Sequence, residues 1–182
     1  MSRVTTFSRF FPHGHPRAGE PTYFVEQILN CLYPEGFDFH FEDYLRELNP
    51  DLPEALLDEF RESLHPNINK EKLHTIRAGK GCKAGDMFSP RVWSSRPYMS
   101  KQIIFAPDQE LKSVIDVEIN KLWQVWFNGE LCGDLHWPNQ FEKLKDLSLN
   151  DGLDTTDLRS WFEKRLPFSG QIRIWSDKKL PY

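Results

Sequence analysis

The pattern of the chain changes near residue 70, and this change constrains the fold more than any other feature. Before it, apolar residues recur at helical spacing in three segments; after it come short runs rich in β-branched and aromatic residues, separated by turn signals. Helices followed by many short strands predict an α+β fold. The 182 residues, 39% of them hydrophobic, suffice for one domain with a substantial core.

Helical periodicity predicts three helices in the first half of the chain. They are expected at residues 22–32, 40–48 and 51–64. Asp51, followed three residues later by Glu54, resembles a capping box at the start of the third. A later helix is predicted from Asp154 to Leu166, whereas residues 136–150 are predicted to be irregular or only partly helical. The segment 22–65 is therefore read as a helical insertion.

Short β-like runs account for most of the remaining chain. Strands are predicted at residues 4–11, 73–77, 87–94, 101–106, 111–119, 123–127, 130–132 and 171–175. Asn128-Gly129 lies between two of them and favours a type I′ hairpin turn. Several short strands with flanking helices suit a mixed, partly open β-barrel.

The formal charge of -4 conceals an uneven distribution. From Glu35 to Glu62 there are ten acidic and two basic residues, a local charge of -8, which leaves +4 for the remainder. This balance argues against bulk nonspecific binding of nucleic acid but leaves room for a basic cleft that accepts a nucleotide or short strand. The acidic helices at 40–64 are a candidate surface for a protein partner, or simply an insertion packed on the barrel.

The chain has no apolar run of the length that a membrane helix requires and no apolar signal core after Met1, so we expect a cytoplasmic protein without a membrane partner. Its three cysteines are scattered and form no Cys-x-x-Cys pair, which favours reduced thiols. His13 and His15 stand without a third ligand at fixed spacing. We expect no metal and no cofactor.

A basic stretch from Lys70 to Asp86 is the first candidate site. It places five cationic side chains around Thr75 and His74 on a short predicted strand bounded by glycines. A hydroxyl, amines and a guanidinium delivered to one place indicate a reactive or anion-binding site. The alternative is a solvated basic hairpin.

The string Lys72-x-x-Thr75-Ile76-Arg77, followed by Gly85-Asp86, resembles the signature of ASCH domains, small β-barrels of the PUA-like fold. Within that superfamily the chain is most similar to bacterial acetylcytidine amidohydrolases. Residues 7–10 resemble their first strand, and residues 151–162 resemble their acidic loop and final helix. The resemblance covers about residues 1–20 and 70–176.

The resemblance implies a single ASCH/PUA-like domain over residues 1–182 that hydrolyses an acyl amide on a nucleoside. Thr75 would be the nucleophile, Lys72 the base that activates it and Asp151 the acid, at a position where the relatives have glutamate. Like charges near Lys72 would lower its pKa toward neutrality. Arg77 and Arg9 would hold the geometry, because a guanidinium matches the two oxygens of a carboxylate.

The residues themselves leave other functions open. Residues i and i+3 of one strand point to opposite faces, so Lys72 approaches Thr75 only if it precedes the strand or lies at a bulge. His74 is a substitute base, a polar group of the cleft, or a solvent-facing residue. In a non-catalytic module that binds RNA or a modified nucleotide, Trp93 and Tyr98 would stack on bases and Lys101 would contact phosphate.

Overall fold

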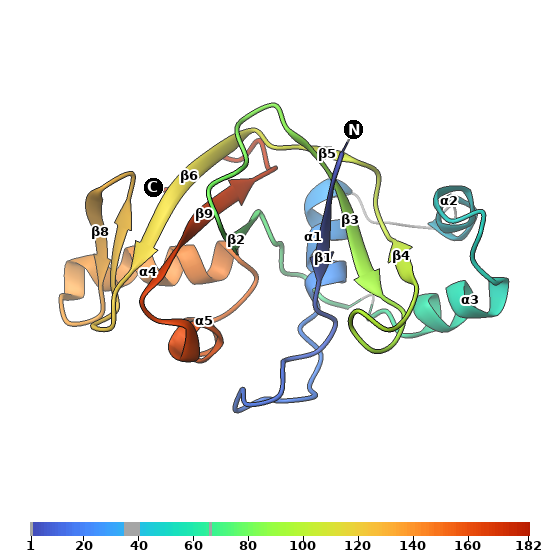
Figure 1. The fold of residues 1–182 in the computed structure, drawn as a ribbon, viewed down its shortest axis with the longest axis horizontal. Coiled ribbons are helices and arrows are strands. Elements are labelled where there is room, and N and C mark those ends of the chain that lie inside the picture. Colours follow the sequence, from blue (N-terminus) through green and yellow to red (C-terminus); the bar gives the residue numbers. More distant parts are fainter. Residues whose placement is uncertain (1, 35–40, 66) are drawn as a thin grey trace. The chain divides into compact units, whose positions relative to one another are not determined.

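The computed structural model describes residues 2–34, 41–65 and 67–182 and divides the chain into two compact units (Figure 1). Unit 1 consists of Met1–His13, Arg17–Glu71 and Asp86–Glu110, and unit 2 of Gly14–Pro16, Lys72–Gly85 and Leu111–Tyr182. His40, which was predicted to begin the second helix, lies outside the described residues, as do Glu35, Gly36 and Pro66 near the predicted helix ends.

Unit 1 contains a small sheet and three helices. Its elements are β1 (Arg3–Phe7), α1 (Phe24–Leu32), α2 (Phe41–Leu48), α3 (Glu54–Glu62), β3 (Met87–Trp93), β4 (Gln102–Ile104) and β5 (Gln109–Glu110). Strand β3 pairs with β1 in parallel and with β4 and β5 in antiparallel. The first strand is shorter than predicted, because beyond Phe7 only an isolated bridge joins Phe10 to Pro21.

The three helices of unit 1 lie within the segment in which they were predicted. Val25, Ile28 and Leu29 form the buried face of α1. Asn49 follows α2 and exchanges 2.8 Å side-chain hydrogen bonds with the backbone of Ile104 on β4.

The predicted capping box at Asp51 is wrong. Helix α3 begins at Glu54 after Pro53, without a side-chain cap among the described residues. Proline disfavours helical geometry in the residue before it, so Leu52 does not join a helix that starts at Asp51.

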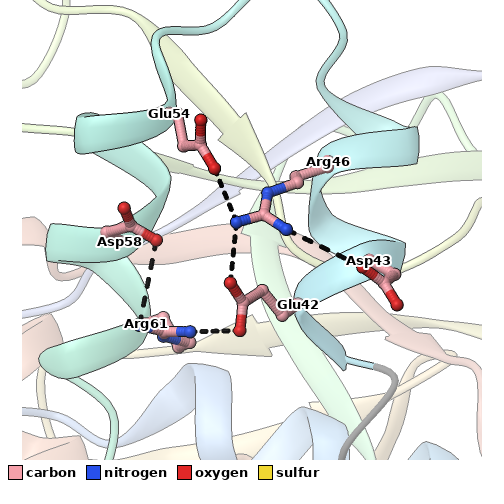
Figure 2. Close-up of polar contacts among 6 residues, drawn as sticks. All are labelled: Glu42, Asp43, Arg46, Glu54, Asp58 and Arg61. Carbon is pink, nitrogen blue, oxygen red and sulfur yellow. Dashed lines mark hydrogen bonds and ion pairs between the residues drawn. The ribbon is translucent and has the colours of Figure 1, made fainter.

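Arginines link the acidic helices α2 and α3 to each other (Figure 2). Arg46 Nη2 lies 2.7 Å from both Glu42 Oε1 on its own helix and Glu54 Oε1 on α3, while Arg61 of α3 pairs with the other oxygen of Glu42. Asp43 and Asp58 extend the network at 3.7 and 3.8 Å. The side chains are well exposed, so each pair contributes little alone, but together they offset part of the acidic charge.

Unit 2 is a five-stranded antiparallel sheet with two α-helices. Its elements are β2 (His74–Ala78), β6 (Ser113–Ile119), β7 (Gln124–Phe127), β8 (Glu130–Asp134), α4 (Pro138–Asn150), α5 (Thr155–Phe162), the 3-10 helix η1 (Glu163–Arg165) and β9 (Phe168–Ile174). The strand order is β2-β9-β6-β7-β8. The predicted hairpin turn is confirmed: Asn128 and Gly129 both have positive φ, 49° and 87°, as a type I′ turn requires.

Within residues 136–150, predicted to be irregular or only partly helical, Pro138–Asn150 form the 13-residue helix α4, so this prediction is wrong. Leu144 and Leu147 are buried on it at a spacing of three residues. A Cβ at Gly133 of β8 would lie 2.6 Å from Leu144, so this glycine lets α4 pack directly on the sheet. The helix after Asp154 is confirmed, because the Asp154 carboxylate accepts a hydrogen bond from Asp157 N at 2.7 Å.

The fold class is α+β. The strands of the described residues form two sheets, one in each unit, and neither sheet closes into a barrel. None of the three cysteines, all of which lie in the described residues, forms a disulfide. No helix within the described residues is long and apolar enough to cross a membrane.

Candidate functional site

Backbone hydrogen bonds bring the segment before β2 to the end of α4 in unit 2. Leu73 N donates to Asn150 O at 2.8 Å, and Trp175 N donates to Leu73 O at 3.4 Å. Asp151 is the C-cap residue of α4, and its own N–H donates to Leu147 O at 3.1 Å. Because Lys72 precedes β2, the alternation of side chains between the two faces of the strand does not fix its direction, and its side chain reaches the end of α4.

Lys72 and Asp151 form a buried ion pair. Lys72 Nζ lies 2.7 Å from Asp151 Oδ1 and also donates to the backbone carbonyl oxygen of Asp151. The two side chains are 1% and 9% exposed. A cation at this place also compensates the partial negative charge that a helix carries at its C-terminus. The pair therefore attaches β2 to α4 and places an amine beside a carboxylate.

Burial and the mutual attraction of the pair shift the pKa values of both groups. Burial, with a smaller contribution from the Arg77 guanidinium, lowers the pKa of Lys72 from 10.5 to about 8 against the attraction of Asp151. Burial alone would raise the pKa of Asp151, but the Lys72 ammonium and His74 hold it below its usual value. Asp151 is thus ionised at neutral pH, while Lys72 has a substantial neutral fraction in mildly alkaline solution.

His74 is the third buried member of this cluster. Its Nδ1 lies 3.6 Å from Asp151 Oδ1, beyond hydrogen-bond distance, and neither ring nitrogen has a hydrogen-bond partner among the described residues. Burial lowers the pKa of His74 despite the opposing effect of Asp151, so the imidazole is neutral. The ring of Tyr182 stands edge-on to it at 5.9 Å, and Asn150 Nδ2 lies 3.0 Å from the Tyr182 hydroxyl.

Thr75 and Arg77 belong to the other face of β2. Side chains alternate along a strand, so Thr75 and Arg77 point away from the face that carries His74. Thr75 is opposite Arg173 of β9 in the antiparallel register, which makes Arg77 and Arg173 diagonal neighbours on one face. Arg173 Nε is buried without a hydrogen-bond partner among the described residues.

The same face of unit 2 carries further polar groups. Gln171, opposite Arg77, accepts a hydrogen bond from Cys82 N at 3.0 Å and donates to Asp116 of β6 at 3.1 Å. Lys80 lies 3.3 Å from Asp116. We name the set Thr75, Arg77, Arg173 and Gln171 the polar face of unit 2.

The other predicted site residues belong to unit 1. Arg9 lines a cavity beside α1. Trp93 ends β3 and its ring lies 5.4 Å from that of Tyr98, which is 88% exposed in the loop before β4. Lys101 directly precedes β4 and is exposed. The prediction that residues 70–83 and Lys101 line one cleft stays a prediction.

Arg173 was not predicted as a site residue from the sequence. Its position between two isoleucines indicates a polar side chain opposite an apolar face, but the pairing with Thr75 depends on the register of β2 and β9.

His15, considered as a metal ligand, is buried in unit 2 against helix α5, where its Nε2 lies 3.2 Å from Asp157 O. Within the part of the chain that the structure describes, no three His, Cys, Asp or Glu residues are grouped so that they could hold a metal. Comparison with protein-family models, curated proteins and solved structures finds no match to this chain.

Proposed function

We propose that the chain is an ASCH-like protein of the PUA-like superfamily that acts on a nucleoside or RNA through unit 2. The observation that carries this proposal is the polar face, where Arg77 and Arg173 flank Thr75 on adjacent strands. Two guanidinium groups at diagonal positions suit the oxygens of a phosphate, and the threonine hydroxyl adds a donor or acceptor. Binding without catalysis is the function that this geometry supports best.

Strand alternation is the reason for preferring binding. A Thr75 nucleophile needs its base within hydrogen-bond reach, yet Lys72 is held against Asp151, on the His74 side of β2. The Lys72–Asp151 pair then acts as an internal brace that fixes the position of β2 and, through it, of the polar face.

A fluorescence anisotropy titration of short single-stranded RNA tests the binding proposal. Arg173→Gln is expected to weaken RNA binding about tenfold. It should also reduce the slope of the logarithm of the binding constant against the logarithm of the salt concentration by the equivalent of about one phosphate contact. Arg159→Gln is the matched control, since it removes an exposed arginine of the same unit that lies over Trp123 on another element. Equal effects of the two variants, or no RNA binding at low salt, would contradict the proposal.

A second candidate function is hydrolysis of N-acylated cytidine, and the lowered pKa of Lys72 favours it. A neutral amine beside an ionised carboxylate is suited to general-base chemistry. The reaction would cleave the acyl C–N bond with water and release a carboxylate and cytidine. Thr75 as nucleophile would require a local change in β2 that brings its hydroxyl to the Lys72 side.

Chromatographic detection of cytidine released from acetylcytidine distinguishes the two functions. If the chain is a hydrolase, the wild type turns the substrate over, and Lys72→Ala abolishes turnover while circular dichroism shows a retained fold. RNA binding without turnover of any acylated nucleoside would establish the binding function alone.

A further inference from the structure

Unit 1 contains a cavity of about 380 Å³, lined by residues of that unit. Its volume falls in the range of small-molecule sites. Its wall combines polar groups with aromatic rings: Arg9, Glu26, Ser63, Phe10, Tyr23 and His65.

Arg9 is held in a fixed position at this cavity. Its Nη2 donates to Ser63 Oγ at 2.5 Å, and its guanidinium carbon lies 5.5 and 5.4 Å from the ring centres of Phe10 and Phe60. Contacts with two rings orient the guanidinium plane. A guanidinium has five N–H donors, so the bond to Ser63 leaves donors for a ligand.

Glu26 supplies an acceptor at the same cavity. It is 5% exposed, and its Oε1 accepts a hydrogen bond from His65 N at 3.1 Å. A carboxylate accepts several hydrogen bonds, so capacity for a ligand donor remains. Among the described residues that line the cavity, Glu26 and Glu62 are acidic and Arg9 alone is an arginine or lysine, so the charges there disfavour a phosphate.

We propose that this cavity binds a nucleobase or a closely similar planar heterocycle. The base would offer a ring acceptor to Arg9 and an N–H donor to Glu26, pairings that arginine and glutamate make with base edges in nucleic-acid complexes. Phe10, which is 49% exposed, and the Tyr23 ring, edge-on to His65 at 5.1 Å, provide apolar surfaces for the faces of the base. This site does not rest on the function proposed for unit 2.

Isothermal titration calorimetry with three probes tests the assignment. 1-Methylcytosine has both a donor and acceptors, 1,3-dimethyluracil has acceptors only, and ribose 5-phosphate has no base. We expect 1-methylcytosine to bind once per chain and at least about tenfold more tightly than the other two. The reason is that it alone has both an acceptor for Arg9 and an N–H donor for Glu26 on one base edge. Absence of 1-methylcytosine binding up to its solubility limit, or tighter binding of ribose 5-phosphate, would overturn the proposal.

Matched variants locate the binding. Arg9→Lys keeps the charge but loses the planar fork, and we expect it to weaken 1-methylcytosine binding about tenfold. Glu26→Gln keeps an acceptor for His65 N and should reduce the preference for 1-methylcytosine over 1,3-dimethyluracil. Arg17→Lys and Glu20→Gln change an arginine–glutamate pair of unit 1 outside the cavity and should change neither. If the Arg9 and Glu26 variants bind like the wild type, the base binds elsewhere and the assignment is wrong.

Discussion

Replacement of Lys72 by methionine is the perturbation whose outcome the structure determines most closely. The amine is 1% exposed, and its removal leaves the Asp151 carboxylate buried without its cation. Breaking a buried pair in this way costs about 3–5 kcal/mol of unfolding free energy. In Lys72→Met/Asp151→Asn neither charge remains, so most of this loss should be recovered.

The pH dependence gives the same pair a second, independent signature. The lowering of the Lys72 pKa from 10.5 to about 8 corresponds to about 3 kcal/mol. Below pH 8 the amine is protonated in both the folded and the unfolded state, so it contributes no pH dependence. Between pH 8 and 10.5 the folded state has released a proton that the unfolded state still binds, so this group makes the unfolding free energy rise with pH.

Urea unfolding at several pH values between 7 and 10.5 measures both effects, since the Lys72 contribution spans that window. The alkaline rise should be present in the wild type and smaller in Lys72→Met. Lys80→Met is the matched control, because it removes a lysine that is 44% exposed and ion-paired to Asp116. It should change the unfolding free energy little and keep the rise. A Lys72→Met variant as stable as the wild type, with an unchanged alkaline slope, would refute the reasoning.

Three further substitutions test other parts of unit 2 by the same unfolding measurement. Asp154→Ala removes the cap of α5 and should cost about 1 kcal/mol, whereas Asp154→Asn should cost less. Gly170→Ala places a Cβ 2.1 Å from the Arg77 carbonyl oxygen and should cost more than the same change at exposed Gly79, where space is open and only the positive φ of 84° disfavours alanine. His74→Phe removes two ring nitrogens that have no hydrogen-bond partner among the described residues, so we expect an equal or higher unfolding free energy; a large loss would mean that His74 has a buried partner.

The elements with local signals were predictable from the sequence. The Asn128-Gly129 turn and the Asp154 cap each depend on residues a few positions apart, and both are present. Helix α4 was missed because its buried leucines become recognisable only against β8, where Gly133 lets the helix approach. The helix start predicted at Asp51 is wrong because Pro53 disfavours helical geometry at Leu52, and the capping-box pattern takes no account of this constraint.

The same distinction, between local signals and contacts of distant segments, applies to the candidate site. The meeting of Lys72 with Asp151, 79 residues later, was expected from family resemblance rather than from any pattern in the residues. Alternation along β2 was readable from the sequence, and it already separated Thr75 from His74. The strand that pairs with β2, and the register of that pairing, could not be predicted from the sequence because they depend on contacts between distant segments. Arg173 therefore became a candidate only when β9 was seen beside β2.

The two faces of β2 carry different chemistry, and this division bears on function. The face with His74 carries the buried Lys72–Asp151 pair, and the His74 ring packs against the ring of Tyr182. The opposite face carries the half-buried guanidinium groups of Arg77 and Arg173 on adjacent strands, beside Thr75, which is 5% exposed. A substrate at Lys72 must reach a side chain that is 1% exposed, whereas an anion at Arg173 would meet a half-buried side chain. A hydrolase should therefore show turnover that depends on the stability of the Tyr182 packing, so Tyr182→Ala would change activity on acetylcytidine but leave RNA affinity unaltered.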